Sequence, residues 1–401
     1  MAKESAARAA STKGINVFGY HTGVFGVAKT AVAFSLAMRA SHVQVNQILL
    51  AGSESHKHVP PRERGFALDK EAEHFVSIFF ANADTTEAVR GQVTTTLWRL
   101  RYNIGFWEWE LDIFPEEWMS YLPHFDEIWV PSTFIADALM RSQGYKGTPV
   151  KVLPVPLLHA KQPANEFKAM EKLQALFKDT FLFLVTFDFL SVLERKNPYA
   201  ALRAFQEAFV NDENVRLVIK SVNGHHFPKT LDKLQHDAFS DGRITLISEH
   251  LSDMEMNWLQ SQVNCYVSLH RSEGYGLNIL ESLSLGIPVI ATAYGGNTDF
   301  FKQISHINSK CHFPIPYELI EVGPHAKPYP STAKWAQPSH AAAVEAMRKV
   351  YELKCFAVQE AQHILQAFSS EAIAKRANIL LQDSMGKIWQ KKTETDKYHS
   401  W

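Results

Sequence analysis

Two glutamates flank a glycine-containing turn in the stretch SLHRSEGYGLNILES, residues 268–282. Glu273 directly precedes the turn at 274–276, and Glu281 lies in a following segment with the apolar spacing of a helix. Glycines between a strand and a helix let a ligand approach backbone N–H groups, and the positive end of the helix favours an anion. We therefore expect the amides of residues 274–277 to hold an anionic ligand.

The spacing of these two carboxylates suits one extended ligand better than a shared metal ion. If the helical rise of ~1.5 Å per residue held throughout, the two residues would lie roughly 12 Å apart. A carboxylate accepts paired hydrogen bonds from neighbouring hydroxyls, so one could hold a sugar ring and the other a ribose. The alternative is that Glu273 and Glu281 are solvated glutamates near a helix end, which the glycines and flanking strands make less favoured.

A basic pair, Arg195 and Lys196, is expected in the loop after the apolar strand over 181–189 and just before a helix. Ligands of doubly wound sheets bind outside the carboxyl ends of the strands, so we expect this pair at the same crevice as the turn at 274–276. Two cations there could offset the charge of a diphosphate leaving group. The alternative is an exposed basic pair beside Glu194.

Other polar residues carry weaker indications. Arg271 is expected either to orient Glu273 or close the pocket, or to form a structural ion pair at the strand end. The loop GYHTGVFG, residues 19–26, contains His21 but lacks the G-x-G-x-x-G spacing of a dinucleotide site. The aromatic run FWEWELDIFPEEW, 106–118, fits either core packing or a sugar acceptor, because its interleaved acids are unfavourable in a dry core.

The elements around these motifs alternate between strands and helices, which indicates parallel sheets covered on both faces. Ser132 is expected to cap the helix after the strand that begins at 127. The predicted strands cover 14–20, 74–82, 99–110, 127–130, 150–156, 181–189, 215–222, 243–248, 263–270 and 287–292. The predicted helices cover the part of 21–40 after the loop, 133–142, 197–209, 252–262, 276–285, 338–353 and 371–390.

A length of 401 residues predicts two domains. The boundary is expected at the proline-containing segment 154–165, which resembles a hinge. This places an acceptor-side Rossmann-like domain at 14–158 and a nucleotide-sugar domain at 159–367. Residues 1–13 are expected to be a disordered leader, and 368–401 a helical segment that crosses back to the first domain.

Composition excludes several classes of protein. With 41 basic and 42 acidic residues, the chain has no overall charge that would attract nucleic acid or an anionic membrane. Three widely spaced cysteines fit neither a disulfide framework nor a zinc cluster, and we expect a reducing cytoplasmic location. The histidines at 56–58 and 225–226 lack neighbouring ligands, so no metal or cofactor is expected. No segment has the ~20 consecutive apolar residues of a membrane helix.

The motifs ERKNP, HRSEGYGLNILES and GIPVIATAYGGNTDF, in this order, resemble those of the retaining nucleotide-sugar glycosyltransferases of family 4, in a bacterial branch. Glu273 and Glu281 match that family's two glutamates separated by seven residues, and the resemblance extends over about 14–390. It implies an α/β protein with the GT-B fold, in which two Rossmann-like domains face each other across a cleft. Such enzymes usually need no metal.

The resemblance also assigns roles to residues. Glu273 would contact the transferred sugar beside its anomeric carbon, and Glu281 would bind the ribose hydroxyls. Lys196 and Arg195 would hold the diphosphate as part of the catalytic set. The residues expected to bind the donor through the turn and the 19–26 loop are Gly274, Tyr275, Gly276, Leu277 and Gly23.

The chain departs from the family pattern in two places. Many members carry the arginine several residues ahead of the lysine, about where Ser191 stands here. Many also place a histidine near the reacting sugar in the first domain, whereas this chain has FWEWE at 106–110. His21, Glu108 and Trp109 are the candidates for that acceptor-side position.

We therefore expect a retaining transferase that moves a hexosyl group from a nucleoside-diphosphate sugar to a hydroxyl of a saccharide, glycolipid or glycoconjugate, in polysaccharide or cell-surface glycan synthesis. Peripheral attachment to the inner face of the membrane stays open. The alternatives are a GT-B relative that binds nucleotide sugars without turning them over, and an oxidoreductase, which the absence of G-x-G-x-x-G argues against.

Overall fold

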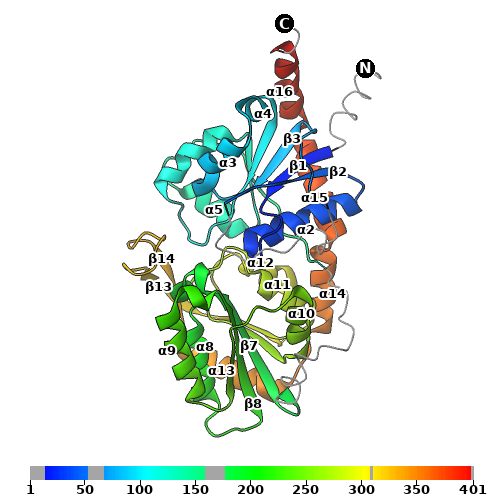
Figure 1. The fold of residues 1–401 in the computed structure, drawn as a ribbon. Helices are drawn as coiled ribbons and strands as arrows, with labels where there is room; N and C mark the ends of the chain where they lie inside the picture. Colours follow the sequence, from blue (N-terminus) through cyan, green and yellow to red (C-terminus); the bar gives the residue numbers. More distant parts are fainter. Residues whose placement is uncertain (1–13, 53–66, 159–176, 308–309, 399–401) are drawn as a thin grey trace. The chain divides into compact units, whose positions relative to one another are not determined.

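The computed structural model describes residues 14–52, 67–158, 177–307 and 310–398. The chain divides into two compact units (Figure 1). The first unit contains Met1–Leu158 and Gln366–Trp401, and the second contains His159–Leu365. The predicted leader at 1–13 and the histidines at 56–58 lie outside the described residues.

The first unit is built on a six-stranded parallel sheet with the order β2-β1-β3-β4-β5-β6. Every residue of β1, β3, β4 and β5 is buried, as expected for strands that helices cover on both faces. The strands are β1 (Gly14–Gly19), β2 (Gln44–Leu49), β3 (Val76–Phe80), β4 (Tyr102–Phe106), β5 (Glu127–Val130) and β6 (Val150–Val152). The helices include α2 (Gly26–Ala40), α3 (Thr86–Gln92), α4 (Thr95–Leu100) and α5 (Thr133–Arg141).

Two local predictions in this unit have different outcomes. The cap is confirmed, because the hydroxyl of Ser132 accepts a hydrogen bond from the amide of Ile135 at 3.3 Å. The strand predicted over 99–110 is too long, since β4 ends at Phe106. The amide of Glu108 donates to the side-chain oxygen of Asn82 at 2.8 Å instead of to a neighbouring strand, so the chain leaves the sheet there.

The C-terminal helices α15 (Ser370–Asp383) and α16 (Met385–Tyr398) belong to the first unit. The single helix predicted over 371–390 is interrupted at Ser384, which hydrogen-bonds the buried carboxylate of Glu127. Lys151 donates to the carbonyl of Leu380 at 2.9 Å. These contacts attach the end of the chain to β5 and β6.

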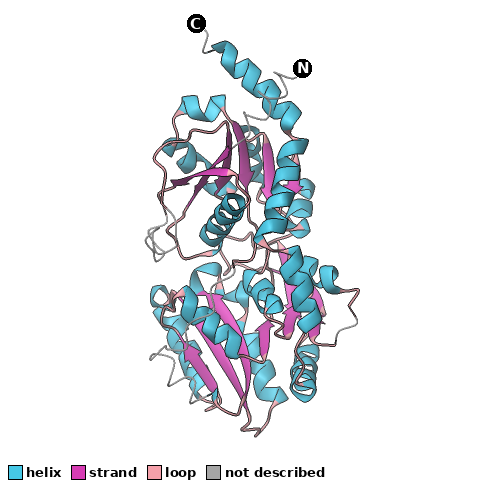
Figure 2. Ribbon diagram, turned by 90° about the vertical axis from the view of Figure 1, so that its right-hand side faces the viewer, coloured by secondary structure: helices cyan, strands magenta, loops and turns pink. Residues whose placement is uncertain are grey.

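The second unit has a six-stranded parallel sheet with the order β12-β11-β10-β7-β8-β9, with helices on both faces (Figure 2). Alternate residues of β7, among them Phe183 and Val185, join the core formed with α8 and α13. The strands are β7 (Phe181–Asp188), β8 (Val215–Val222), β9 (Ile244–Ile247), β10 (Cys265–Ser268), β11 (Val289–Thr292) and β12 (His312–Ile315). The helices include α7 (Leu193–Lys196), α8 (Pro198–Ala208), α9 (Pro228–Phe239), α10 (Asp253–Gln262), α11 (Leu277–Ser284), α12 (Thr298–Ile304), α13 (His340–Leu353) and α14 (Val358–Ala367).

An antiparallel hairpin in the second unit was not predicted from the sequence. Its strands are β13 (Tyr317–Glu321) and β14 (Lys334–Pro338), with Leu319 opposite Ala336. All five residues of β13 are exposed, so no alternation of buried and exposed positions marks it in the sequence.

The expectation that the cysteines form no disulfides is wrong for one pair. Cys311 and Cys355 are joined as a disulfide, with their Cα atoms 6.1 Å apart, whereas Cys265 is free and buried. The two residues precede β12 and follow α13, and their proximity arises from the fold. Over the described ranges, no helix is both long and apolar enough to cross a membrane.

Candidate active site

The candidate site lies where β10 leads into α11. The helix begins at Leu277, after Gly276, whose φ of +95° is a left-handed conformation that favours glycine. Gly276 supplies no side-chain cap, and the first turn of α11 contains no acidic residue. The positive end of the helix dipole therefore lies next to the loop that carries Glu273. Glu273 lies in the loop before α11, so the helical rise on which the estimated separation from Glu281 depended does not hold throughout.

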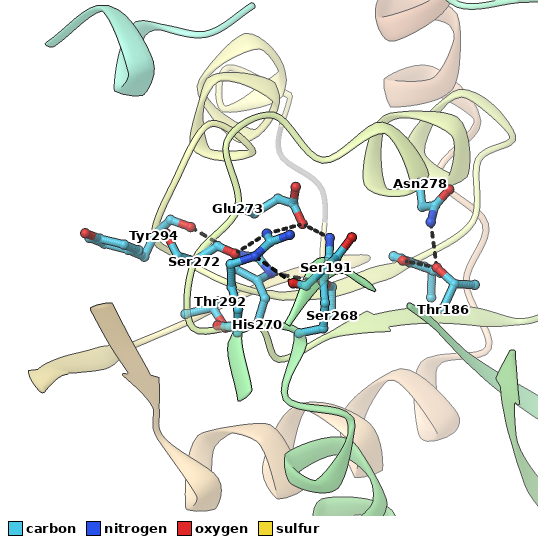
Figure 3. A network of polar contacts seen from close by, with 12 residues as sticks. Thr186, Ser191, Ser268, His270, Ser272, Glu273, Asn278, Thr292 and Tyr294 are labelled. Carbon is cyan, nitrogen blue, oxygen red and sulfur yellow. Dashed lines mark hydrogen bonds and ion pairs between the residues drawn. The ribbon is translucent and has the colours of Figure 1, made fainter. Parts of the chain in front are cut away.

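Arg195 and Lys196 both point to Glu273 (Figure 3 shows the surrounding network). Nζ of Lys196 lies 2.6 Å from Oε2 of Glu273, and a terminal guanidinium nitrogen of Arg195 lies 3.7 Å from the same oxygen. The pair meets Glu273 because β7 and β10, which precede these segments, are neighbours in the sheet. The alternative of an exposed basic pair is wrong, because the side chains of Arg195 and Lys196 are only 4% and 20% exposed.

Arg195 also holds the backbone of the site. Its Nε donates to the carbonyl of Ser191 at 3.1 Å, and its Nη1 donates to the carbonyl of Ser272 at 3.0 Å. The sequence predicted a loop for Arg195 and Lys196. In the structure both residues lie in the single helical turn of α7. Arg195 therefore holds two backbone segments together in addition to supplying a positive charge.

The electrostatics keep the Glu273 carboxylate ionised. Burial would raise the pKa of this group, but the charges of Lys196 and Arg195 outweigh burial and lower the pKa to about 2. At neutral pH Glu273 is thus an anion, which accepts hydrogen bonds and stabilises positive charge. It is not suited to donate a proton as a general acid.

His270 connects the Glu273 loop to the next strand. It is fully buried, with Nε2 3.0 Å from the carbonyl oxygen of Tyr294 and Nδ1 2.9 Å from Oγ of Ser268. The carbonyl can only accept, so Nε2 carries the proton and Nδ1 accepts from the hydroxyl. Burial lowers the pKa of the imidazole, which favours this neutral form. Thr292 completes the connection by donating to the carbonyl of His270 at 2.6 Å.

A second glycine turn, which the sequence analysis did not assign to the site, packs directly on Glu273. The amide of Gly296 donates to the carbonyl of Glu273 at 2.8 Å. Gly295 has a φ of +103°, and a Cβ atom there would lie 2.2 Å from the Glu273 carbonyl oxygen. The adjacent glycines after the strand at 289–292 were the available sequence signal.

The remaining donor-side residues have separate surroundings. Glu281, half-buried on α11, accepts from Nε2 of Gln260 at 3.2 Å. The buried ring of Tyr275 packs edge-on against Phe300, with ring centroids 5.0 Å apart, so its side chain is a packing group. Gly274 lies in the turn before α11, and Leu277 is the first residue of the helix.

A polar cluster beside the turn was also missed by the sequence analysis. Nδ2 of Asn278, in the first turn of α11, donates to Oγ1 of Thr186 at 2.6 Å (Figure 3). The hydroxyls of Thr186 and Tyr266 are 2.7 Å apart. These contacts join α11 to β7 and β10 and thereby fix the direction of the helix start.

The acceptor-side candidates and Gly23 belong to the first unit. His21 is buried, with Nε2 3.0 Å from the carbonyl oxygen of Val17, and the amide of Gly23 donates to the carbonyl of Tyr20 at 2.8 Å. This places both residues in the loop between β1 and α2.

Glu108 and Trp109 differ in their exposure. Glu108 is half-buried and accepts from Oγ1 of Thr30 at 2.8 Å. Trp109 is 3% exposed, donates from Nε1 to the carbonyl of Ile113, and packs on Phe114. The ring of Trp109 therefore has the core-packing role, which was one of the two interpretations of the aromatic run.

No group of three or more His, Cys, Asp or Glu side chains that could hold a metal ion is found among the residues that the structure describes. The rings of His225 and His226 lie next to each other, with centroids 4.1 Å apart and an interplanar angle of 39°, in the segment before α9.

Residues 157–307 match the family model described as Glycosyl transferases group 1. This segment contains the turn at 274–276 and the residues that surround it, including Lys196, Glu273 and Glu281. No curated protein sequence matches the chain significantly. The family match supports glycosyl transfer from a nucleotide sugar as the general activity.

Solved structures resemble the chain along most of its length. Sucrose-phosphate synthase of Thermosynechococcus elongatus has a TM-score of 0.63 at 14% identity, covering 93% of this chain and 99% of that one. A glycosyltransferase of Rickettsia africae has a TM-score of 0.61 at 12% identity, covering 93% and 98%. HepE of Anabaena, solved with UDP, has a TM-score of 0.56 at 11% identity, covering 92% and 100%. Together with the two parallel sheets, these likenesses confirm the predicted GT-B fold.

Proposed function

We propose that the protein is a retaining glycosyltransferase of the family 4 type, which transfers a hexosyl group from a nucleoside-diphosphate sugar to a hydroxyl of a saccharide, glycolipid or glycoconjugate. The observation that carries the proposal is the ion pair of Glu273 with Lys196, at 2.6 Å, immediately before the start of α11. A synthesis pathway for a polysaccharide or a cell-surface glycan is the proposed setting, in the cytoplasm or at the inner face of the membrane.

The diphosphate of the donor would bind to the amides of residues 274–277 and to the two cations. Glu273 offsets one of the two positive charges of Lys196 and Arg195. A bound diphosphate would share these cations, and its negative charge increases as the bond to the sugar breaks. Because the cations are already held in place, they stabilise the transition state without reorganisation. This positive charge would make a metal ion unnecessary.

The transfer itself would occur on one face of the sugar. The bond between the anomeric carbon and the diphosphate oxygen breaks, and its electron pair stays on that oxygen. The acceptor hydroxyl oxygen forms the new bond to the anomeric carbon and gives its proton to a phosphate oxygen. Glu273, ionised at neutral pH because its pKa is about 2, would lie beside the anomeric carbon and stabilise its positive charge.

The other residues would set the position of the two substrates. Glu281 would bind the ribose hydroxyls, because a carboxylate accepts paired hydrogen bonds from adjacent hydroxyls. Gly23, in the first unit, would approach the donor, and Glu108 would lie on the acceptor side. For His21 and Trp109 the proposal is indirect, since both side chains are enclosed and would act by shaping the segments that carry Gly23 and Glu108.

A ligand screen followed by a turnover assay tests the proposal. UDP, GDP and ADP, and their glucose conjugates, are added to the full chain and the unfolding temperature is measured, because a ligand of the native state raises it. Release of nucleoside diphosphate from the conjugate is then compared between wild type and Glu273→Gln. Binding with release that depends on Glu273 supports a transferase. Binding without release indicates a non-catalytic nucleotide-sugar protein, and no binding at all contradicts the proposal.

A further inference from the structure

Arg271 connects three parts of the second unit. Its Nη1 donates to the carbonyl of Glu194, in α7, at 3.0 Å. Its Nε donates to the side-chain oxygen of Gln337, in β14, at 3.0 Å, and its guanidinium lies 5.5 Å from the ring centroid of Trp335 in the same strand. The structural ion pair, one of the two expectations from the sequence, is not found among the described residues, because this side chain hydrogen-bonds a backbone carbonyl and an amide oxygen. The other expectation, that Arg271 orients Glu273 or closes the pocket, stays a prediction.

The backbone of Arg271 repeats the same connection. Its amide donates to the carbonyl of Arg195 at 2.7 Å, and its carbonyl accepts from the amide of Ala336 at 2.8 Å. Residue 271 therefore contacts α7 on one side and the hairpin on the other through both main chain and side chain. It lies two positions before Glu273, in the same loop.

The turn of α7 needs such support because it is short. A helix of four residues has little stability of its own, and two residues that flank α7, Val192 and Asn197, have positive φ angles of 63° and 50°. The other contacts between this turn and the 269–273 loop come from Asn197, which donates to the carbonyl of Leu269 at 2.9 Å, and from the Arg195 and Lys196 side chains. Arg271 differs from these residues because its side chain also contacts the β13–β14 hairpin.

We propose that Arg271 is a positioning residue: it holds the α7 turn against the β13–β14 hairpin, and so fixes Lys196 and Arg195 at the distance from Glu273 that the diphosphate site requires. The hairpin, residues 317–338, is thereby part of the site although it lies beyond the segment that matches the family model. This inference rests on the proposed function for its catalytic consequence, but the structural connection can be measured without it.

Arginine suits this role better than lysine. Its planar group donates from two nitrogens in fixed directions, here to two acceptors on different elements, while its face lies over an aromatic ring. Lysine at 271 could reach one acceptor but could not make both bonds and the ring contact together. Arg271→Lys is therefore expected to be intermediate between wild type and Arg271→Met.

Hydrogen–deuterium exchange on the full chain tests the connection directly. The amides of Arg195, Lys196 and Asn197 bond to carbonyls of residues 192 and 193 within the turn. We expect Arg271→Met to speed exchange at 193–197 by roughly 10-fold or more. The matched control is Arg216→Met, since Arg216 also donates to a backbone carbonyl, that of Gly242, but from the amino-terminal end of β8. Unchanged exchange at 193–197 in Arg271→Met overturns the proposal.

A double-mutant cycle tests the functional consequence. The tightest-binding of UDP, GDP and ADP is titrated by calorimetry into wild type, Arg271→Met, Lys196→Ala and the double variant. If Arg271 acts through the turn that carries Lys196, its substitution weakens binding about 10-fold in wild type and about 2-fold or less in the Lys196→Ala background. Equal effects in both backgrounds overturn the proposal.

The two arms separate the failure of this inference from that of the proposed function. If wild type binds none of the three nucleotides, the proposed function fails, and the exchange measurement alone still decides whether Arg271 supports α7. If nucleotides bind but both arms show no role for Arg271, only the positioning inference fails.

Discussion

Lys196 and Glu273 are 77 positions apart in the chain, and their charged groups are 2.6 Å apart in the fold. Neither group is widely exposed, since the Lys196 and Glu273 side chains retain 20% and 16% of their accessible surface. A partly buried ion pair at a helix start leaves both charges available to a polar ligand while keeping them in place. The following predictions concern this pair and the backbone that carries it.

Replacing Lys196 with Ala should weaken binding of nucleoside diphosphates. A charge-assisted hydrogen bond to phosphate contributes about 1.5–3 kcal/mol, which corresponds to a roughly 10- to 150-fold higher dissociation constant. Calorimetry with UDP, GDP and ADP measures it. Lys233→Ala is the control, because Lys233 is exposed on α9 and pairs with Asp237. An equal dissociation constant for wild type and Lys196→Ala would remove the lysine from the diphosphate site.

Replacing Glu273 with Gln should reduce turnover by roughly 100-fold or more, because the neutral amide stabilises positive charge at the sugar less well. Nucleotide affinity should change little by comparison. Glu281→Gln should behave differently and raise the donor KM, since its proposed contact is with the ribose. Steady-state kinetics on both variants separates the two roles, and identical losses of kcat for both would refute the division of labour between the glutamates.

The low pKa of Glu273 predicts a pH dependence of stability. Burial acts against ionisation, but Lys196 and Arg195 lower the pKa from 4.5 to about 2. Between pH 2 and pH 4.5 the folded state therefore binds fewer protons than the unfolded state. The contribution of the ionised Glu273 to the free energy of unfolding is complete above about pH 4.5 and is lost as the pH falls towards 2. Its size is at most ~3 kcal/mol.

Urea unfolding of wild type and Glu273→Gln measures this contribution. The difference in the free energy of unfolding between the two proteins should be constant from pH 7 to about 5 and should shrink below that. A difference that stays constant down to pH 3 would show that the carboxylate does not carry this stabilisation.

Replacing Gly295 with Ala should damage the site through the backbone of Glu273. A Cβ atom would lie 2.2 Å from the Glu273 carbonyl oxygen, and the φ of +103° is unfavourable for alanine. We expect a loss of roughly 2 kcal/mol or more in stability, together with loss of turnover. The matched control is Gly323→Ala, with φ +79° and open space around its Cβ position, which should cost about 1 kcal/mol.

Thermal unfolding and kcat measured on both glycine variants check this prediction. Comparable kcat values in Gly295→Ala and Gly323→Ala would mean that the turn at 294–297 adjusts without moving Glu273, and that its close packing has no bearing on turnover.

The sequence alone determined the fold class and the segments of the candidate site. Continuous apolar runs such as 181–185 predict a parallel sheet, because only strands covered on both faces need no polar alternation. Glycine between a strand and a helix predicts the turn at 276, since its left-handed backbone favours glycine. Both are local properties, set by residues close to one another in the chain.

Only the tertiary structure decided which groups contact one another. The pairing of Lys196 with Glu273, the hydrogen bond of Arg271 with Gln337, and the disulfide of Cys311 with Cys355 each join segments that are distant in sequence. The order of strands in the sheet brings these segments together, and no local pattern encodes that order. The exposed hairpin and the packing of Gly295 on Glu273 escaped prediction for the same reason, because each is defined by its neighbours in space.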